Sequence, residues 1–120
     1  MSNKGQGYAF RDDVLLCLHE HGFHTAARPG ERHGVPLEQR QPRGDIVNLP
    51  ITLAVKSGTD ELKLSGALVE AQSEARAEGK DVFATIHRRR GHGVESSFVV
   101  TDMTTFLRLL SRLHPEIVST

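Results

Sequence analysis

The chain has 120 residues and a mass of 13.2 kDa, so residues 1–120 are expected to form one domain with little room for a regulatory module. Its composition, 38% hydrophobic and 25% charged with 15 basic and 15 acidic residues, is typical of a globular protein and argues against a disordered tail or a coiled coil. There is no membrane-length apolar run, no signal-peptide core and only one cysteine, Cys17. We therefore expect a soluble, intracellular, cytoplasmic protein without an internal disulfide.

A helix is predicted over residues 10–21, because apolar residues recur at every fourth position from Phe10 to Leu18 and Gly22 follows as a stop. The pair Asp12-Asp13 then lies in its first turn, where acids favour the positive end of the helix dipole.

Extended structure is predicted after this helix. Residues 23–28 have the character of a short strand, and residues 29–44 form a loop with prolines and glycines among charges. The β-branched segments 45–47 and 51–56 indicate two strands, which residues 48–50 join as a hairpin.

A second helix is predicted over residues 64–79, with Leu64, Leu68, Ala71 and Ala75 on one side. Its leucines either pack in the core or form a dimer surface.

The last third of the chain contains two strands and a helix. Residues 82–87 indicate a buried strand, 88–93 a basic turn and 97–100 another strand. Thr101 or Asp102 is expected to cap the final helix. One face of this helix carries Phe106, Leu110 and Leu113. This face is expected either to pack in the core or to form a dimer surface.

This order predicts an α/β fold with a mixed sheet and flanking helices. Residues 51–87 have the length of a β-α-β crossover, which makes at least one strand pair parallel and is expected to be right-handed.

A charged pair is expected at one end of the sheet. Alternation places residues 54 and 56 on one face, and the predicted hairpin lays Asp45 beside them. Asp45 and Lys56 on a hydrophobic sheet are costly unless they pair with each other or bind something. A simple ion pair and a functional site are therefore both open at this point.

The chain resembles the PD-(D/E)XK nucleases, and among them the small Holliday-junction-resolvase-like endonucleases carried by many phages and archaea. The resemblance spans residues 4–110 and implies an αβββαβ core. Its motifs, taken together in order and spacing, are Gly7-Tyr8-Ala9-Phe10, Gly22-Phe23, Arg43-Gly44-Asp45-Ile46, Val55-Lys56, Glu70-Ala71 and Arg88-Arg89-Arg90-Gly91.

The resemblance implies Mg²⁺- or Mn²⁺-dependent cleavage of DNA phosphodiesters. By position, Asp45 and the Val55 carbonyl would hold the metal and Lys56 would be the catalytic lysine. Mg²⁺ prefers hard oxygen ligands and keeps several waters, one of which can become the nucleophile.

The chain departs from the family pattern at two positions. The motif glutamate is replaced by Ala54, and Arg11 stands where relatives often have an acid. Each missing carboxylate forgoes attraction of order 8 kcal/mol at ~4 Å and an effective dielectric of ~20, before desolvation is subtracted. Metal binding is thus expected to be weak or absent, and the chain inactive as written.

Two explanations fit the replacement at position 54. Either the natural protein carries a glutamate there and this chain was made inactive, or the chain is a natural relative that binds DNA without cutting it. Since Asp45 and Lys56 have little reason to persist in an inactive site, the first explanation is preferred at this point.

DNA contacts are predicted mainly at arginines, whose planar forks match phosphate oxygens, and at glycines, which let a backbone approach closely. We expect backbone shape rather than base sequence to be read. The predicted contacts are Lys4, Gly7, Arg40, Arg43, Arg88, Arg89, Arg90 and His92.

The resemblance also implies a homodimer acting on four-way or other branched DNA in recombination, and a phage-encoded protein in a bacterial host. The alternative class is a non-catalytic DNA-binding protein derived from the same fold. A weaker third possibility is an interaction module whose arginines pair with an acidic partner.

Overall fold

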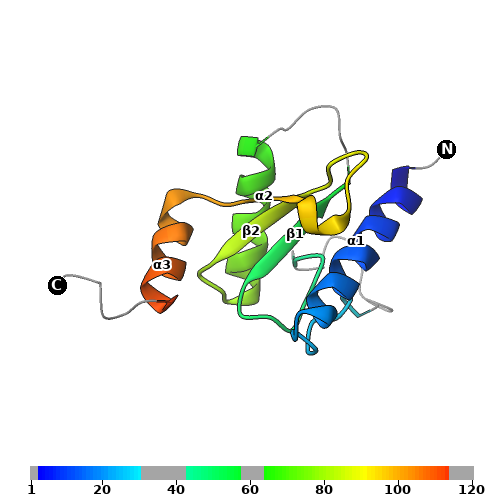
Figure 1. Cartoon of the computed structure of the whole chain (residues 1–120). Helices are drawn as coiled ribbons and strands as arrows, with labels where there is room; N and C mark the ends of the chain where they lie inside the picture. The colour runs from blue at the N-terminus through cyan, green and yellow to red at the C-terminus, as the bar shows by residue number, and fades with distance from the viewer. Residues whose placement is uncertain (1–2, 31–42, 58–63, 114–120) are drawn as a thin grey trace.

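The computed structural model describes residues 3–30, 43–57 and 64–113, and of residues 3–8 only the backbone. Most of the predicted loop 29–44 lies outside these ranges. No helix in the described part is both long and apolar enough to cross a membrane. The elements (Figure 1) are α1 (Asn3–Glu20), β1 (Thr52–Lys56), α2 (Leu64–Glu78), β2 (Phe83–His87), the short 3-10 helix η2 (Val94–Ser96), β3 (Phe98–Val100) and α3 (Met103–Leu113).

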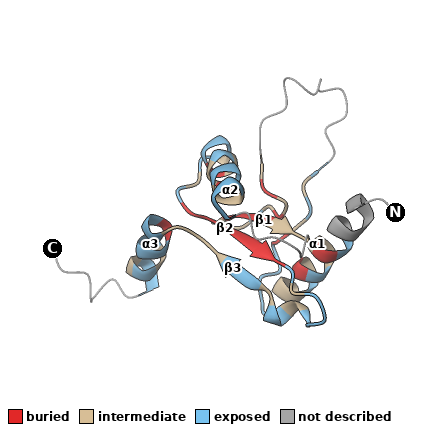
Figure 2. Cartoon of the chain, turned by 90° about the horizontal axis from the view of Figure 1, so that it is seen from above, coloured by how far each residue is buried: buried red, intermediate tan, exposed pale blue. Residues whose placement is uncertain are grey.

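The three strands form one mixed sheet in the order β1-β2-β3. Strand β1 runs parallel to β2, and β3 runs antiparallel to β2. Helix α2 is the crossover between the parallel strands, as the length of residues 51–87 predicts. Helices α1 and α2 lie on opposite sides of the sheet (Figure 2). The predicted α/β class with a mixed sheet and flanking helices is thus confirmed.

Two small apolar clusters hold these layers together, and the alternation of β1 divides its side chains between them. Leu53 packs with Phe10 and Val14 of α1, whereas Ala54 packs with Ala71 and Ala75 of α2. Fully burying a leucine- or phenylalanine-sized side chain contributes roughly 1.5–3 kcal/mol. The first cluster therefore fixes α1, while the alanines of the second allow α2 to approach the sheet closely.

The strands predicted over residues 23–28 and 45–47 are wrong. These segments form only two isolated antiparallel bridges, Ala27 with Val47 and Ile46 with Leu53. The ladder along β1 does not continue because a side-chain carboxylate, that of Asp45, takes the place of a backbone carbonyl as the next acceptor.

The first helix begins at Asn3, seven residues before the predicted start. Gly7 is therefore helical, and Asp12 and Asp13 lie in the body of the helix instead of its first turn. The prediction fails because it begins with the first buried side chain, Phe10, while a helix once nucleated extends by one hydrogen bond per residue. Asp12 forms an ion pair with Arg28 at 2.9 Å.

The cap predicted for the last helix is confirmed. The Thr105 N–H donates to Oδ1 of Asp102 at 2.8 Å, a cap that contributes about 1 kcal/mol. The predicted apolar face of this helix is exposed at Phe106, Leu110 and Leu113, so these three residues do not pack in the core.

We expect Gly44→Ala to destabilise the fold, because a Cβ at residue 44 would lie 2.8 Å from the Leu53 carbonyl oxygen and 3.0 Å from Cγ2 of Thr52. Displacing that backbone costs on the order of 1–3 kcal/mol. The matched control is Gly66→Ala in α2, where a Cβ meets nothing within 4 Å, so the variant gains about 0.5–1 kcal/mol. Urea unfolding measures both; equal stabilities of the two variants would contradict the close approach at Gly44.

Candidate functional site

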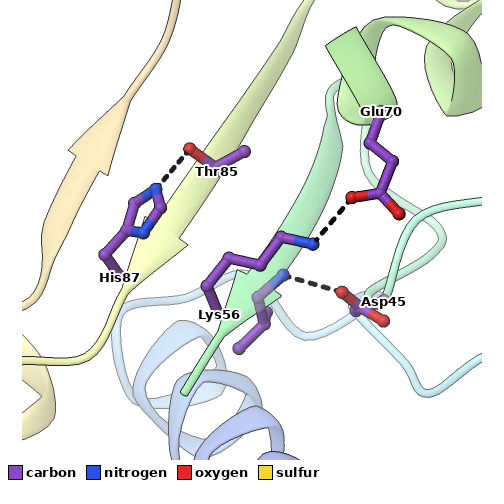
Figure 3. Close-up of polar contacts among 6 residues, drawn as sticks. Asp45, Lys56, Glu70, Thr85 and His87 are labelled. Carbon is purple, nitrogen blue, oxygen red and sulfur yellow. Dashed lines mark hydrogen bonds and ion pairs between the residues drawn. The ribbon is translucent and has the colours of Figure 1, made fainter. Parts of the chain in front are cut away.

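One edge of β1 faces away from β2 and carries the predicted aspartate. The Thr52 N–H and the Lys56 carbonyl bond toward β2, so the backbone groups of Leu53 and Val55 point to the opposite edge. There the Asp45 N–H donates to the Leu53 carbonyl at 2.8 Å, and the Val55 N–H donates to Oδ2 of Asp45 at 2.7 Å (Figure 3). Asp45 is therefore held beside the end of β1.

Lys56 ends β1 and points toward α2. Its Nζ lies 3.3 Å from Oε2 of Glu70 (Figure 3). Exposed pairs of this kind contribute about 0–1 kcal/mol, so the contact orients the ammonium group more than it stabilises the fold. The structure thus brings Asp45 and Lys56 together at one end of one strand edge, and their catalytic roles stay predictions.

A third charged group, Glu74, lies one turn after Glu70 on α2 and was not singled out by the sequence. The pKa of Glu74 is raised to about 7, first by burial and then by the nearby negative charge of Asp45, while Lys56 opposes the shift. A signal for it does exist in the sequence: glutamates at positions 70, 74 and 78 recur at four-residue spacing and so share one side of the helix.

Glu78, the last of these glutamates, holds the segment before Asp45 in place. It accepts hydrogen bonds from the Gly44 N–H, from the Thr52 hydroxyl at 3.1 Å and from Nζ of Lys80 at 2.7 Å. Burial alone would raise the pKa of Glu78, but these bonds outweigh it and lower the pKa. Glu78 is therefore a structural carboxylate.

His87 is a second residue that sequence reasoning missed. It is buried at the end of β2, in register with Lys56, and Nε2 of His87 lies 2.7 Å from the Thr85 hydroxyl (Figure 3). Burial, and then the charge of Lys56, lower the pKa of His87. The imidazole is thus neutral at pH 7 and adds no positive charge beside the lysine.

Position 54 is packed for a small side chain. Ala54 is fully buried, and it packs against Ala71, Ala75 and Phe83. A glutamate at this position would have to displace α2 or bury its carboxylate among apolar groups.

The oxygen donors at the edge suit a hard cation only in part. Within the described ranges, no group of three or more His, Cys, Asp or Glu side chains is placed to hold a metal ion. Asp45 and Glu74 offer carboxylates, and the Val55 carbonyl points to the same edge as the Val55 N–H. Mg²⁺ is commonly bound through only one or two carboxylates and several waters, so these donors fit Mg²⁺ in kind.

The arginine run begins at the same end of the sheet, because the Arg88 N–H donates to the Lys56 carbonyl at 3.0 Å. The guanidinium of Arg89 lies 4.5 Å from the centre of the Phe98 ring, and it donates to the Ser96 carbonyl. Arg90 is exposed.

Arg88 and His92 line a hollow of about 360 Å³ between α1 and residues 88–95. Its wall also carries the acids Asp13, Glu20 and Glu95, so this face is of mixed charge.

The remaining predicted DNA contacts are less well placed by the structure. Arg43, the residue directly before Gly44, donates a hydrogen bond to the Gly30 carbonyl. Lys4 and Gly7 lie in the first turns of α1, where only the backbone is described. Arg40 lies outside the described residues.

Comparison with known proteins adds no relative to this picture. The chain matches no protein-family model, and neither a curated protein nor a solved structure is significantly similar to it.

The raised pKa of Glu74 predicts a pH-dependent stability. Glu74 binds its proton up to a pKa of about 7 in the folded chain but only to its ordinary value of 4.5 when unfolded. Its contribution is therefore fully present below pH 4.5 and is lost as the pH rises through 7. Glu74→Gln removes this titration, so its unfolding free energy relative to the original protein should increase with pH. We expect on the order of 1 kcal/mol, below the full linkage value because solvent screens a half-exposed group.

Urea unfolding of both proteins across this pH range measures the difference. A difference that stays constant with pH would show that Glu74 titrates as it does in the unfolded chain.

Proposed function

We propose that this chain is a metal-dependent DNA endonuclease of the PD-(D/E)XK type, with Asp45, Glu74 and Lys56 as its active groups. The observation that carries the proposal is that Asp45 and Lys56 lie at the same end of β1, and that Glu74 of α2 lies near enough to both for their charges to shift its pKa. This is the set of charges that the family resemblance calls for, with the second acid supplied by α2 instead of β1.

The electrostatics support a functional rather than a structural role for Glu74. Burial and the charge of Asp45 both disfavour its ionised form, so ionised Glu74 weakens the folded state. Groups whose ionisation is disfavoured by a specific neighbour are often found at catalytic sites. A divalent cation held by Asp45 and Glu74 would offset that penalty.

The metal, when bound, would be held by Asp45, Glu74 and the Val55 carbonyl, and would polarise a phosphate oxygen and acidify a bound water. The chain's own contribution is positional. Lys56, turned toward the acids of α2, places a positive charge where negative charge develops on the phosphate.

The packing of Ala54 supports a naturally small residue at this position. Because its surroundings are alanines and a phenylalanine, the explanation that an original glutamate was removed fits the structure less well than an acid transferred to Glu74. In this proposal the chain is active as written, against the expectation drawn from Ala54 alone.

The proposed substrate is DNA, and branched DNA in particular follows from the family resemblance. The start of the arginine run beside Lys56 supports a phosphate-binding face next to the acids. Arg88 and Arg90 are exposed, whereas Arg89 already lies over a ring.

We expect the protein to cut a four-way DNA junction in the presence of Mg²⁺, and Glu74→Gln, Asp45→Asn and Lys56→Ala each to lose at least ~100-fold in rate. The control is Arg76→Gln, an exposed charge on the same helix two residues from Glu74, which should retain the rate. Cleavage of a labelled junction with Mg²⁺, and with a chelator, measures the effect. An equal loss of cleavage rate in the Arg76→Gln control would indicate that substitutions on α2 impair its folding rather than the chemical step.

A second candidate function is DNA binding without cleavage. It is favoured by two facts: in the described part no group of three or more His, Cys, Asp or Glu side chains is placed to hold a metal ion, and Lys56 pairs with Glu70. A gel shift with junction DNA but no cleavage in any divalent metal would select this function over the nuclease. Absence of both binding and cleavage would overturn both proposals.

A further inference from the structure

Three residues lie in a row across one end of the sheet, one on each strand. Lys56 of β1 is in register with His87 of β2, and His87 is in register with Phe98 of β3. Directly opposed residues of neighbouring strands project to the same side of a sheet. Alternation along β1 gives Lys56 the side of Ala54, which packs against α2. The whole row therefore faces the α2 side of the sheet.

Phe98 is the exposed end of this row. His87 is buried, whereas Phe98 is 51% exposed. Helix α2 packs against β1 and β2, and Figure 2 shows β3 at the exposed margin of the sheet. A large aromatic ring is thus half open to solvent on the same side of the sheet as Lys56.

The arginine run surrounds this ring with positive charge. The guanidinium of Arg89 lies 4.5 Å from the centre of the Phe98 ring and donates to the Ser96 carbonyl, which orients it. Arg88 and Arg90 on either side of Arg89 are exposed. Proteins that bind unpaired nucleotides combine these two features, because bases stack on aromatic rings and guanidinium planes while arginines attract the phosphates.

The distance between the ring and the lysine fits one strand of DNA. Neighbouring strands of a sheet lie ~4.8 Å apart, so the backbones of Phe98 and Lys56 are separated by about 10 Å. Successive nucleotides of a stacked DNA strand advance by ~3.4 Å each. A strand whose phosphate lies at Lys56 can therefore present a base to Phe98 from within about three nucleotides of that phosphate.

We propose that Phe98 and Arg89 hold one unpaired base of the DNA strand whose phosphate lies at Lys56. This inference rests on the proposed function, because it takes Lys56 as a phosphate contact. A base inside a duplex must first leave its stack, whereas an unpaired base reaches the ring at little cost. The chain thus selects DNA with an unpaired nucleotide near the cut, such as a bulge or a flap, over a junction in which every base is paired. Every base has a π-face, so the selection is independent of base identity.

Binding of DNA in a chelator, where metal-dependent cleavage does not occur, tests this proposal. The probes are a duplex with a one-nucleotide bulge and the same duplex with the bulged nucleotide made abasic. The unaltered protein should bind the first at least ~5-fold more tightly than the second, as one stacked base requires. Phe98→Ala should abolish this preference, and Phe98→Tyr should retain it. The matched control is Val99→Ala, which shortens the next side chain of β3, 65% exposed on the other side of the sheet, and should also retain it.

A second measurement does not depend on the variants folding. In the unaltered protein, the ring-proton NMR signals of Phe98 should move upfield when the bulged duplex is added, because a stacked base shields them, and should move less with the abasic duplex. Equal shifts with the two probes, or a binding preference that survives Phe98→Ala, would overturn the proposal.

The outcomes separate this proposal from the nuclease itself. Cleavage with Mg²⁺ but equal binding of the two probes would overturn the stacking site and leave the nuclease. A preference for the bulged base without cleavage in any divalent metal would support the stacking site and overturn the nuclease. Binding of neither probe would overturn both.

Discussion

The hydrogen bond from the Val55 N–H to the Asp45 carboxylate is the interaction on which the arrangement of the candidate site depends. A hydrogen bond to a charged group contributes about 1.5–3 kcal/mol, and this one occupies a strand edge that would otherwise be open to pairing with other chains. It also fixes a carboxylate next to the last residue of β1. The N–H of the preceding Gly44 donates to Glu78 of α2, and this bond sets the position of Asp45 relative to α2.

The three glutamates of α2 show how neighbours decide the state of chemically identical groups. Glu78 receives several hydrogen bonds, and they lower its pKa despite burial, whereas Glu70 meets the Lys56 ammonium. Glu74 lies between them on the helix, half-buried, and burial together with the charge of Asp45 raises its pKa to about 7. At this position, burial and the like charge of neighbouring acids raise the pKa by more than the attraction to Lys56 lowers it. The stability cost of ionised Glu74 is the physical reason to regard it as a ligand or catalytic group rather than as part of the scaffold.

Elements with a clear period and a nearby breaker were predictable from the sequence. As predicted, helix α2 ends before Gly79 and strand β2 lies within residues 82–87. The crossover through α2 that makes β1 and β2 parallel is also as predicted. The absence of a strand at residues 45–47 was not predictable, because β propensity cannot reveal that a side-chain carboxylate replaces a ladder partner. For the same reason the sequence predicts that Asp45 lies beside β1, but it does not reveal that the side-chain carboxylate makes the contact. The sequence analysis missed Glu74 because Glu74 comes near Asp45 only when the crossover lays α2 along the edge of β1. The available signal in the sequence was its four-residue spacing from Glu70 and Glu78.

The central claim is that Asp45 and Glu74 share one site. The most direct test is a ¹³C NMR titration of the folded protein that follows its side-chain carboxyl signals. The account predicts that Glu74 titrates with a pKa of about 7 and that Asp45→Asn lowers this value, because the variant removes a negative charge beside it. Added Mg²⁺ should lower the pKa of Glu74 in the unaltered protein as well. A pKa of Glu74 at its ordinary value of 4.5, unchanged by Asp45→Asn, would show that the two carboxyl groups do not meet and would contradict the site as described.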